Sequence, residues 1–157
     1  MRTLILYATK YGAAAEIARR IADLIDGAVV HDLKQGGTPA PSGFDCIIVG
    51  SSIYAGSIRK EAKAFLSENA DLLREKPLGL FLSGMDASQE KEFFDANIPG
   101  DILQTAKAAS LLGGVYDPQK AGFMERFIYK AATKQSEYKS TIDDVKIGQF
   151  VEAIAQG

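Results

Sequence analysis

The stretch Thr3-Leu-Ile-Leu-Tyr-Ala-Thr-Lys-Tyr-Gly-Ala-Ala-Ala-Glu16 decides the fold of this chain. Residues 3–7 are rich in strand-forming apolar side chains and too few for a helix, so they predict a buried strand. After Gly12 the apolar residues follow helical spacing and share one face: Ile17, Ala18, Ile21, Ala22, Leu24 and Ile25. The stretch therefore predicts a strand joined by a short loop to an amphipathic helix.

The rest of the chain repeats this alternation of strands and helices. Further strands are predicted at residues 28–31, 44–50, 77–82 and 108–112. Helices are predicted from about Arg59 with Ser57 as cap, in two pieces within 86–106, and near the end with Asp143 or Asp144 as cap. Such alternation implies a parallel sheet with helices on both faces. We expect one domain over residues 1–157, an α/β three-layer, doubly wound fold with a five-stranded parallel sheet.

The composition excludes several classes of function. The 157 residues carry 20 acidic and 18 basic side chains, and a net charge of −2 gives no field for holding nucleic acid. The single cysteine, Cys46, suits a reducing compartment, and the apolar runs are too short for a signal peptide or a membrane span. Neither Cys46 nor the single histidine, His31, has the partners of a metal or nucleophilic site. We expect a cytoplasmic protein with no metal and no catalytic side chain.

The loop after the first strand has the chemistry of a phosphate site. Backbone N–H groups at a helix start lack intrahelical partners and lie at the positive end of the helix dipole. Gly12 allows close approach, Thr9 offers a hydroxyl group and Lys10 a charge. The loop is neither a Walker A sequence nor a G-x-G-x-x-G fingerprint, which disfavours ATP and dinucleotides. The predicted phosphate-binding residues are Thr9, Lys10, Tyr11, Gly12, Ala13 and Ala14; a tight turn that binds nothing is the alternative.

With Thr9 and Gly12 at these positions, the sequence resembles the flavodoxin-like family over nearly its whole length. The resemblance implies a flavodoxin-like sheet with the strand order 2-1-3-4-5 and FMN as the cofactor. It also implies two loops around the flavin ring, the first formed by Ser51, Ser52, Ile53, Tyr54, Ala55 and Gly56, and the second by Ser83, Gly84 and Met85. Tyr54 is the candidate aromatic cover for the ring.

Two positions depart from the family pattern. Ala14 stands where the family often has Thr, and Ala13 where a polar residue is common, so two side-chain donors to phosphate are missing. Backbone N–H groups remain, and Lys10 is the candidate to compensate. The alternative is a degenerate domain that keeps the fold and has lost FMN.

Residues 115–141, called the added segment below, exceed the simplest topology. In them Phe123, Met124, Phe127, Ile128 and Ala131 share a helical face, and residues 113–130 resemble the corresponding part of menaquinone-dependent protoporphyrinogen oxidases. Residues 118–139 hold five basic and two acidic side chains, whereas residues 85–101 hold one basic and five acidic. The basic stripe Arg126, Lys130 and Lys134 is either a docking surface, with peripheral membrane contact through 119–134, or a set of solvated charges on a helix whose apolar side packs on the domain.

The resemblance implies an FMN-binding electron-transfer protein that uses the flavin as a one- or two-electron carrier, with a redox partner protein or a quinone as partner. The alternative is an FMN-dependent quinone-linked oxidoreductase of the protoporphyrinogen oxidase type. The acidic stretch 85–97 stands where that type is rich in Arg and Lys, so it would repel an anionic porphyrin. In either case the chemistry belongs to the flavin.

Overall fold

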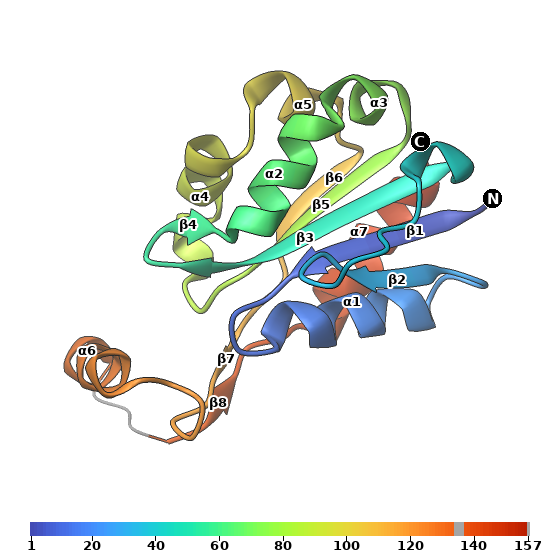
Figure 1. Cartoon of the computed structure of the whole chain (residues 1–157). Coiled ribbons are helices and arrows are strands. Elements are labelled where there is room, and N and C mark those ends of the chain that lie inside the picture. Colours follow the sequence, from blue (N-terminus) through green and yellow to red (C-terminus); the bar gives the residue numbers. More distant parts are fainter. Residues whose placement is uncertain (134–136, 157) are drawn as a thin grey trace.

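A computed structural model describes residues 1–133 and 137–156 of the chain. Its main sheet contains five parallel strands in the order β2-β1-β3-β5-β6, which confirms the predicted topology (Figure 1). The strands are β1 Thr3–Ala8, β2 Val29–Asp32, β3 Cys46–Tyr54, β5 Leu78–Ser83 and β6 Ala108–Leu111. A two-residue strand, β4 Ser57–Ile58, pairs antiparallel with the end of β3.

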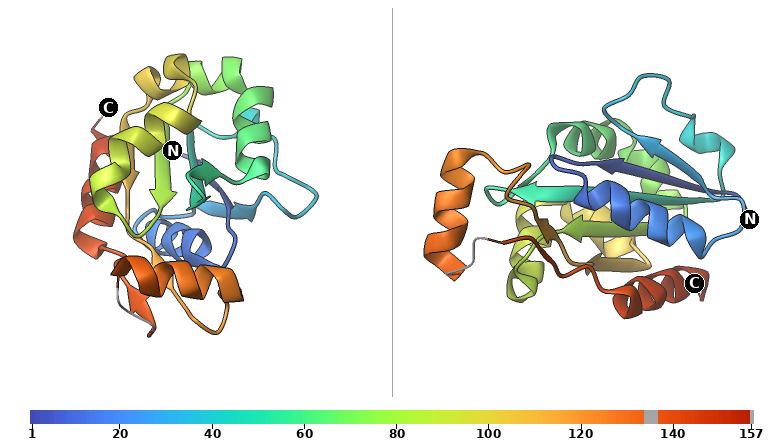
Figure 2. Two further views of the ribbon diagram at one scale, coloured as in Figure 1. Left: turned by 90° about the vertical axis from the view of Figure 1, so that its left-hand side faces the viewer. Right: turned by 90° about the horizontal axis from the view of Figure 1, so that it is seen from below.

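Helices cover both faces of the sheet and complete the three layers. One face is covered by α1 Ala13–Asp23 and α7 Asp144–Ala155, and the other by α2 Lys60–Glu68, α3 Ala70–Glu75, α4 Glu90–Asn97 and α5 Gly100–Thr105 (Figures 1 and 2). Short 3-10 turns lie at Pro41–Gly43 and Ala87–Gln89. The break between α4 and α5 falls at Pro99, as predicted, because proline cannot continue the ladder of helical hydrogen bonds.

The core is divided by the sheet, because successive side chains of a strand point to opposite faces. In β1, Leu4 and Leu6 pack under α2 to α5, while Ile5 packs under α1 and α7. All three side chains are fully buried. The continuous apolar run of residues 4–6 thus reflects a central strand covered on both sides.

Three local predictions are wrong. The third strand does not end at Gly50 but continues to Tyr54, and the chain turns at Ala55 and Gly56, both with positive φ, into β4. Ser57 therefore lies in β4 and does not cap α2, whose N-cap is Arg59. Leu24 is 55% exposed because α1 ends at Asp23, one residue before it. At α7, by contrast, Asp143 is the cap, and its carboxylate accepts hydrogen bonds from the N–H groups of residues 145 and 146.

The added segment forms a small unit beyond the carboxyl ends of the strands (Figures 1 and 2). Strands β7 Val115–Tyr116 and β8 Lys139–Ser140 pair antiparallel as a ribbon that carries α6, Phe123–Thr133. The prediction that the apolar side of this helix packs on the domain is wrong for Phe127 and Ile128, which are 65% and 60% exposed. Lys134 and the side chains of Phe123 and Met124 lie outside the described part of the structure.

Candidate functional site

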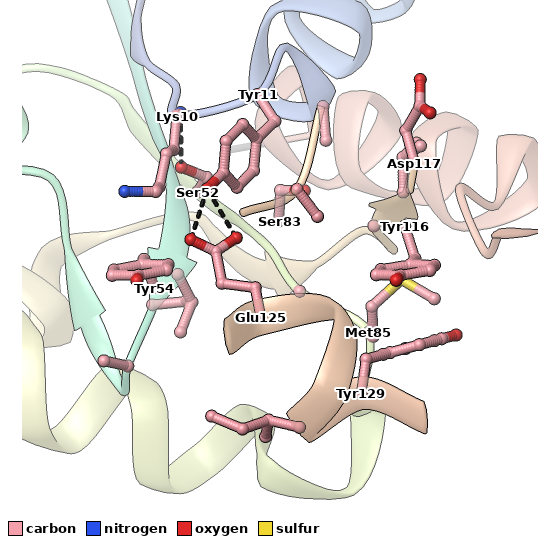
Figure 3. Close-up of a pocket in the computed structure, with 18 of the residues that line it drawn as sticks. Lys10, Tyr11, Ser52, Tyr54, Ser83, Met85, Tyr116, Asp117, Glu125 and Tyr129 are labelled. Carbon is pink, nitrogen blue, oxygen red and sulfur yellow. Dashed lines mark hydrogen bonds between the residues drawn. The ribbon is translucent and has the colours of Figure 1, made fainter. Parts of the chain in front are cut away.

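A cleft of about 450 Å³ lies at the carboxyl edge of the sheet, where the three predicted loops and the added segment meet (Figure 3). Most of its wall is apolar or aromatic. From the predicted loops it is lined by Lys10, Tyr11, Ala13, Ser52, Ile53, Tyr54, Ala55, Ser83, Gly84 and Met85, which the fold brings together from distant parts of the chain. The carboxyl edge of an open parallel sheet is where ligands bind in doubly wound folds.

The loop after β1 is held in place by two hydrogen bonds. The Thr9 hydroxyl accepts from the backbone N–H of Gly12 at 2.9 Å, and the Ser52 hydroxyl accepts from the N–H of Lys10 at 3.1 Å. Gly12 has a φ of 104°, which a residue with a side chain rarely adopts, and it serves as the N-cap of α1. The loop therefore presents the first turn of α1, residues 13–15, whose N–H groups have no intrahelical acceptor, to the space before the helix.

Five of the predicted residues, Thr9, Gly12, Ala14, Ser51 and Gly56, do not line the cleft. The Thr9 hydroxyl accepts a hydrogen bond within the loop, and Ala14, in the first turn of α1, is fully buried. Ser51 is buried, its hydroxyl donating to the carbonyl of Ser52 and accepting from the N–H of Arg59. Gly56 forms the turn into β4, where its carbonyl accepts from the Asn97 amide. These residues stabilise the conformation of the loops and do not contact the cleft.

Tyr54 stands at the end of β3 with 39% of its surface exposed. The Lys10 ammonium group lies 3.8 Å from the centre of its ring, and the Arg59 guanidinium lies 5.8 Å from it. Lys10 is thus engaged with the face of an aromatic ring (Figure 3). Lys10 nevertheless lines the cleft, and its contact with a phosphate stays a prediction.

The third loop is fixed by Gly113 and Gly114, which directly precede the added segment, and by Thr141 at the end of that segment. The N–H of Gly84 donates to the carbonyl of Gly113, and a Cβ placed on Gly114 would lie 2.8 Å from the carbonyl carbon of Gly84. The Met85 sulfur lies 3.9 Å from the Thr141 hydroxyl oxygen. Glycine at 114 therefore allows the two backbones to touch, which sets the position of residues 83–85.

Sequence reasoning missed the far wall of the cleft, which the added segment supplies. This wall contains Gly114, which directly precedes the segment, and from the segment itself Val115, Tyr116, Asp117, Ala121, Glu125, Ile128, Tyr129 and Ala132. The rings of Tyr116 and Tyr129 stack with their centres 3.7 Å apart. The pair Gly113-Gly114, with Tyr116 two positions later, was the available signal, since paired glycines permit such a close backbone approach.

Glu125 connects this wall to the first loop. The Tyr11 hydroxyl lies 2.5 Å from both oxygens of the Glu125 carboxylate and donates to it (Figure 3). Burial, followed by this hydrogen bond and the charge of Glu125, raises the pKa of Tyr11 to about 12. A hydrogen-bonding interaction with Glu125 and its negative charge also raise the pKa of Tyr54, while Arg59 opposes the shift.

The single cysteine and the single histidine do not line the cleft. Cys46 is buried in the core, and burial raises the pKa of its thiol, which disfavours the reactive thiolate. His31 lies 3.2 Å from the Thr38 hydroxyl at the surface. Within residues 1–133 and 137–156 there is no cluster of three metal-binding side chains, and no helix is long and apolar enough to cross a membrane.

Comparison with known proteins gives one family and several solved structures of the same fold. A family model described as a flavodoxin domain matches residues 4–143. No curated protein matches the chain significantly in sequence.

Solved structures of the same fold are only distantly similar in sequence. A short-chain flavodoxin associated with a bacterial microcompartment is 16% identical with a TM-score of 0.60, covering 99% of this chain and 97% of that one. The flavodoxin of Streptococcus pneumonia TIGR4 is 18% identical with a TM-score of 0.56, covering 99% of both chains. A mutant flavo di-iron protein from Thermotoga maritima is 19% identical with a TM-score of 0.55, and the match covers 99% of this chain but 35% of that one.

Proposed function

The chain belongs to the flavodoxin-domain family, and we propose that it binds FMN non-covalently in the cleft and acts as a one- or two-electron carrier. The observation that carries this proposal is the meeting of three loops, from β1, β3 and β5, around one largely apolar cleft. Its volume of about 450 Å³ falls within the range of small-molecule sites, about 300–1,000 Å³.

The residues present fit FMN at both ends. The free N–H groups of residues 13–15 suit the phosphate, because they combine unpaired donors with the positive end of the α1 dipole. Tyr54 and the loop 83–85 would frame the isoalloxazine ring, an apolar and planar group that stacks well on an aromatic side chain. When bound, FMN supplies the redox chemistry, and the protein supplies binding, orientation and exclusion of water.

The direct test is a titration of the purified protein with FMN, followed by desalting and a visible spectrum. We expect flavin bands to persist and the flavin fluorescence to be quenched. Tyr54→Ala should weaken binding of FMN about tenfold. Removal of an aromatic side chain on which a ring stacks lowers the binding free energy by about 1–3 kcal/mol for each nucleic acid base, and the flavin ring is expected to behave similarly. Tyr138→Ala is the matched control, since Tyr138 is an exposed tyrosine outside the cleft. A chain with no micromolar affinity for FMN would be a degenerate domain.

A second candidate function is that of an FMN-dependent quinone-linked oxidoreductase. The observation that favours it is the aromatic wall of the added segment, which gives the cleft more apolar lining than the three flavin loops alone. The test is whether a menaquinone analogue reoxidises the reduced flavoprotein, with and without protoporphyrinogen. Substitution of the exposed Arg126 and Lys130 by Glu should slow this reaction if α6 docks the oxidant or a membrane. If the charges of α6 are only solvated, the rate of reoxidation should not change.

A further inference from the structure

We propose that Lys120, a residue of the added segment, binds the phosphate of FMN and replaces the side-chain donors that Ala13 and Ala14 do not provide. This inference rests on the proposed function and adds a residue to the same site. Lys120 lies outside the phosphate loop by more than a hundred positions, so no motif in the loop indicates it.

The Lys120 ammonium group lies directly at the phosphate loop. Its Nζ atom donates to the carbonyl of Tyr11 at 3.3 Å. It is also 3.6 Å from the point where a Cβ on Gly12 would be, which places the charge beside the peptide that precedes the first turn of α1. A phosphate accepting hydrogen bonds from the N–H groups of that turn would lie next to a positive charge.

The backbone of Lys120 is held in a turn that fixes where its side chain begins. The N–H groups of Lys120 and Ala121 both donate to the carbonyl of Asp117 at 3.0 Å. The Asp117 carboxylate in turn accepts from the N–H of Gln119 at 2.9 Å. An ordered turn lowers the entropy lost when the lysine side chain binds an anion.

The charge of Lys120 is available to a ligand. Among the described residues, salt bridges are formed by Arg19, Arg20, Arg74 and Lys91, and none includes Lys120. Lys10, the lysine within the loop, has its ammonium group over the Tyr54 ring instead. An ammonium group has three N–H donors, so Lys120 can keep its bond to Tyr11 and still donate to a phosphate oxygen.

The competing explanation is that Lys120 only anchors the added segment to the loop through the Tyr11 carbonyl. The two roles differ in one measurable respect. A phosphate-binding lysine discriminates FMN from riboflavin, which has the same ring and side chain without the phosphate. An anchoring lysine supports the binding of both flavins equally.

The experiment is a comparison of dissociation constants for FMN and riboflavin, measured by flavin fluorescence quenching, in the wild type, Lys120→Gln and Lys130→Gln. Lys130 is the matched control, because it is an exposed lysine of the same segment that lies on α6, whereas Lys120 contacts the phosphate loop. We expect Lys120→Gln to weaken FMN binding about tenfold, the effect of one lost charge-assisted hydrogen bond, and to leave riboflavin unchanged. Lys130→Gln should alter neither, and Lys120→Arg should retain most of the preference for FMN.

An equal loss of both flavins in Lys120→Gln, or no loss of FMN, overturns the role of Lys120 while leaving FMN binding intact. If the wild type binds neither flavin, the proposed function itself fails. In that case titration with inorganic phosphate, followed by the amide signals of residues 13 and 14, decides whether Lys120 supports an anion site. Shifts that Lys120→Gln abolishes would support it, and an absence of shifts in the wild type would overturn it.

Discussion

The Tyr11 hydroxyl donates a hydrogen bond to the Glu125 carboxylate at 2.5 Å and so ties the loop after β1 to helix α6. The two residues are 114 positions apart, and one belongs to the predicted phosphate loop while the other belongs to the added segment. The far wall of the cleft is therefore fastened to the loop that faces it. Any loosening of this contact changes both sides of the cleft together.

Tyr11→Phe removes the donor of this bond and should loosen α6. A hydrogen bond of this kind contributes about 1 kcal/mol, so amide exchange in residues 123–133 should be about fivefold faster than in the wild type. Hydrogen exchange measured by mass spectrometry checks this. Tyr138→Phe serves as control, and equal exchange in Tyr11→Phe and the wild type would show that α6 is held by other contacts.

The same bond predicts a dependence of stability on alkaline pH. The pKa of Tyr11 is raised from its ordinary value of 10 to about 12, so the fold favours the neutral phenol. This contribution to the free energy of unfolding is complete below pH 10 and is lost as the pH rises toward 12. The free energies of unfolding of the wild type and Tyr11→Phe, measured with denaturant, should therefore converge over that pH range. A Tyr11 phenolate that appears near pH 10 in the ultraviolet difference spectrum would contradict the prediction.

Glu125→Gln should raise the reduction potential of bound FMN. A carboxylate on the cleft wall disfavours an added electron on the ring, and its removal is expected to raise the potential by a few tens of mV, on the order of 1 kcal/mol. Spectroelectrochemical titration of the FMN-loaded protein measures the shift. Glu137→Gln is the matched control, because it removes an exposed carboxylate of the same segment outside the cleft lining. Identical potentials in the two variants would exclude an electrostatic effect of Glu125.

Gly114→Ala and Gly148→Ala should have opposite effects on stability. A Cβ at 114 would lie 2.8 Å from the Gly84 backbone and force the loop 83–85 to move, at a cost of about 1–3 kcal/mol. Gly148 lies within α7 with nothing within 4 Å of an added Cβ, so alanine there should stabilise the protein by about 1 kcal/mol. Thermal and denaturant unfolding of both variants check the signs. Only Gly114→Ala should also weaken flavin binding.

The alternation of strands and helices and the first loop were predictable because both depend on local patterns, whereas the order of the strands followed from the family resemblance. The apolar run of residues 4–6 and the change to helical spacing after Gly12 fix a strand, a loop and a helix without reference to the rest of the chain. The carboxyl ends of parallel strands share one edge, so the meeting of three loops followed from the order of elements. The extension of β3 to Tyr54 was not predictable, since its last four residues carry no apolar alternation.

The contacts of the added segment lay beyond sequence reasoning for a different reason. Its helix has an apolar face, and packing on the domain was the natural expectation for such a face. The structure instead turns Glu125 and Tyr129 toward the cleft and leaves Phe127 exposed. Likewise, no spacing rule relates Lys120 to Gly12, because their proximity depends on how far the β7–β8 ribbon reaches.

The β7–β8 ribbon has a consequence for how this insertion can be handled. Val115 pairs with Ser140, so the chain leaves the domain and returns to it at neighbouring points. A two-residue turn could close the ribbon in place of α6 without changing the three layers. The three layers should therefore fold without α6, and a variant shortened in this way should unfold cooperatively, as circular dichroism can show.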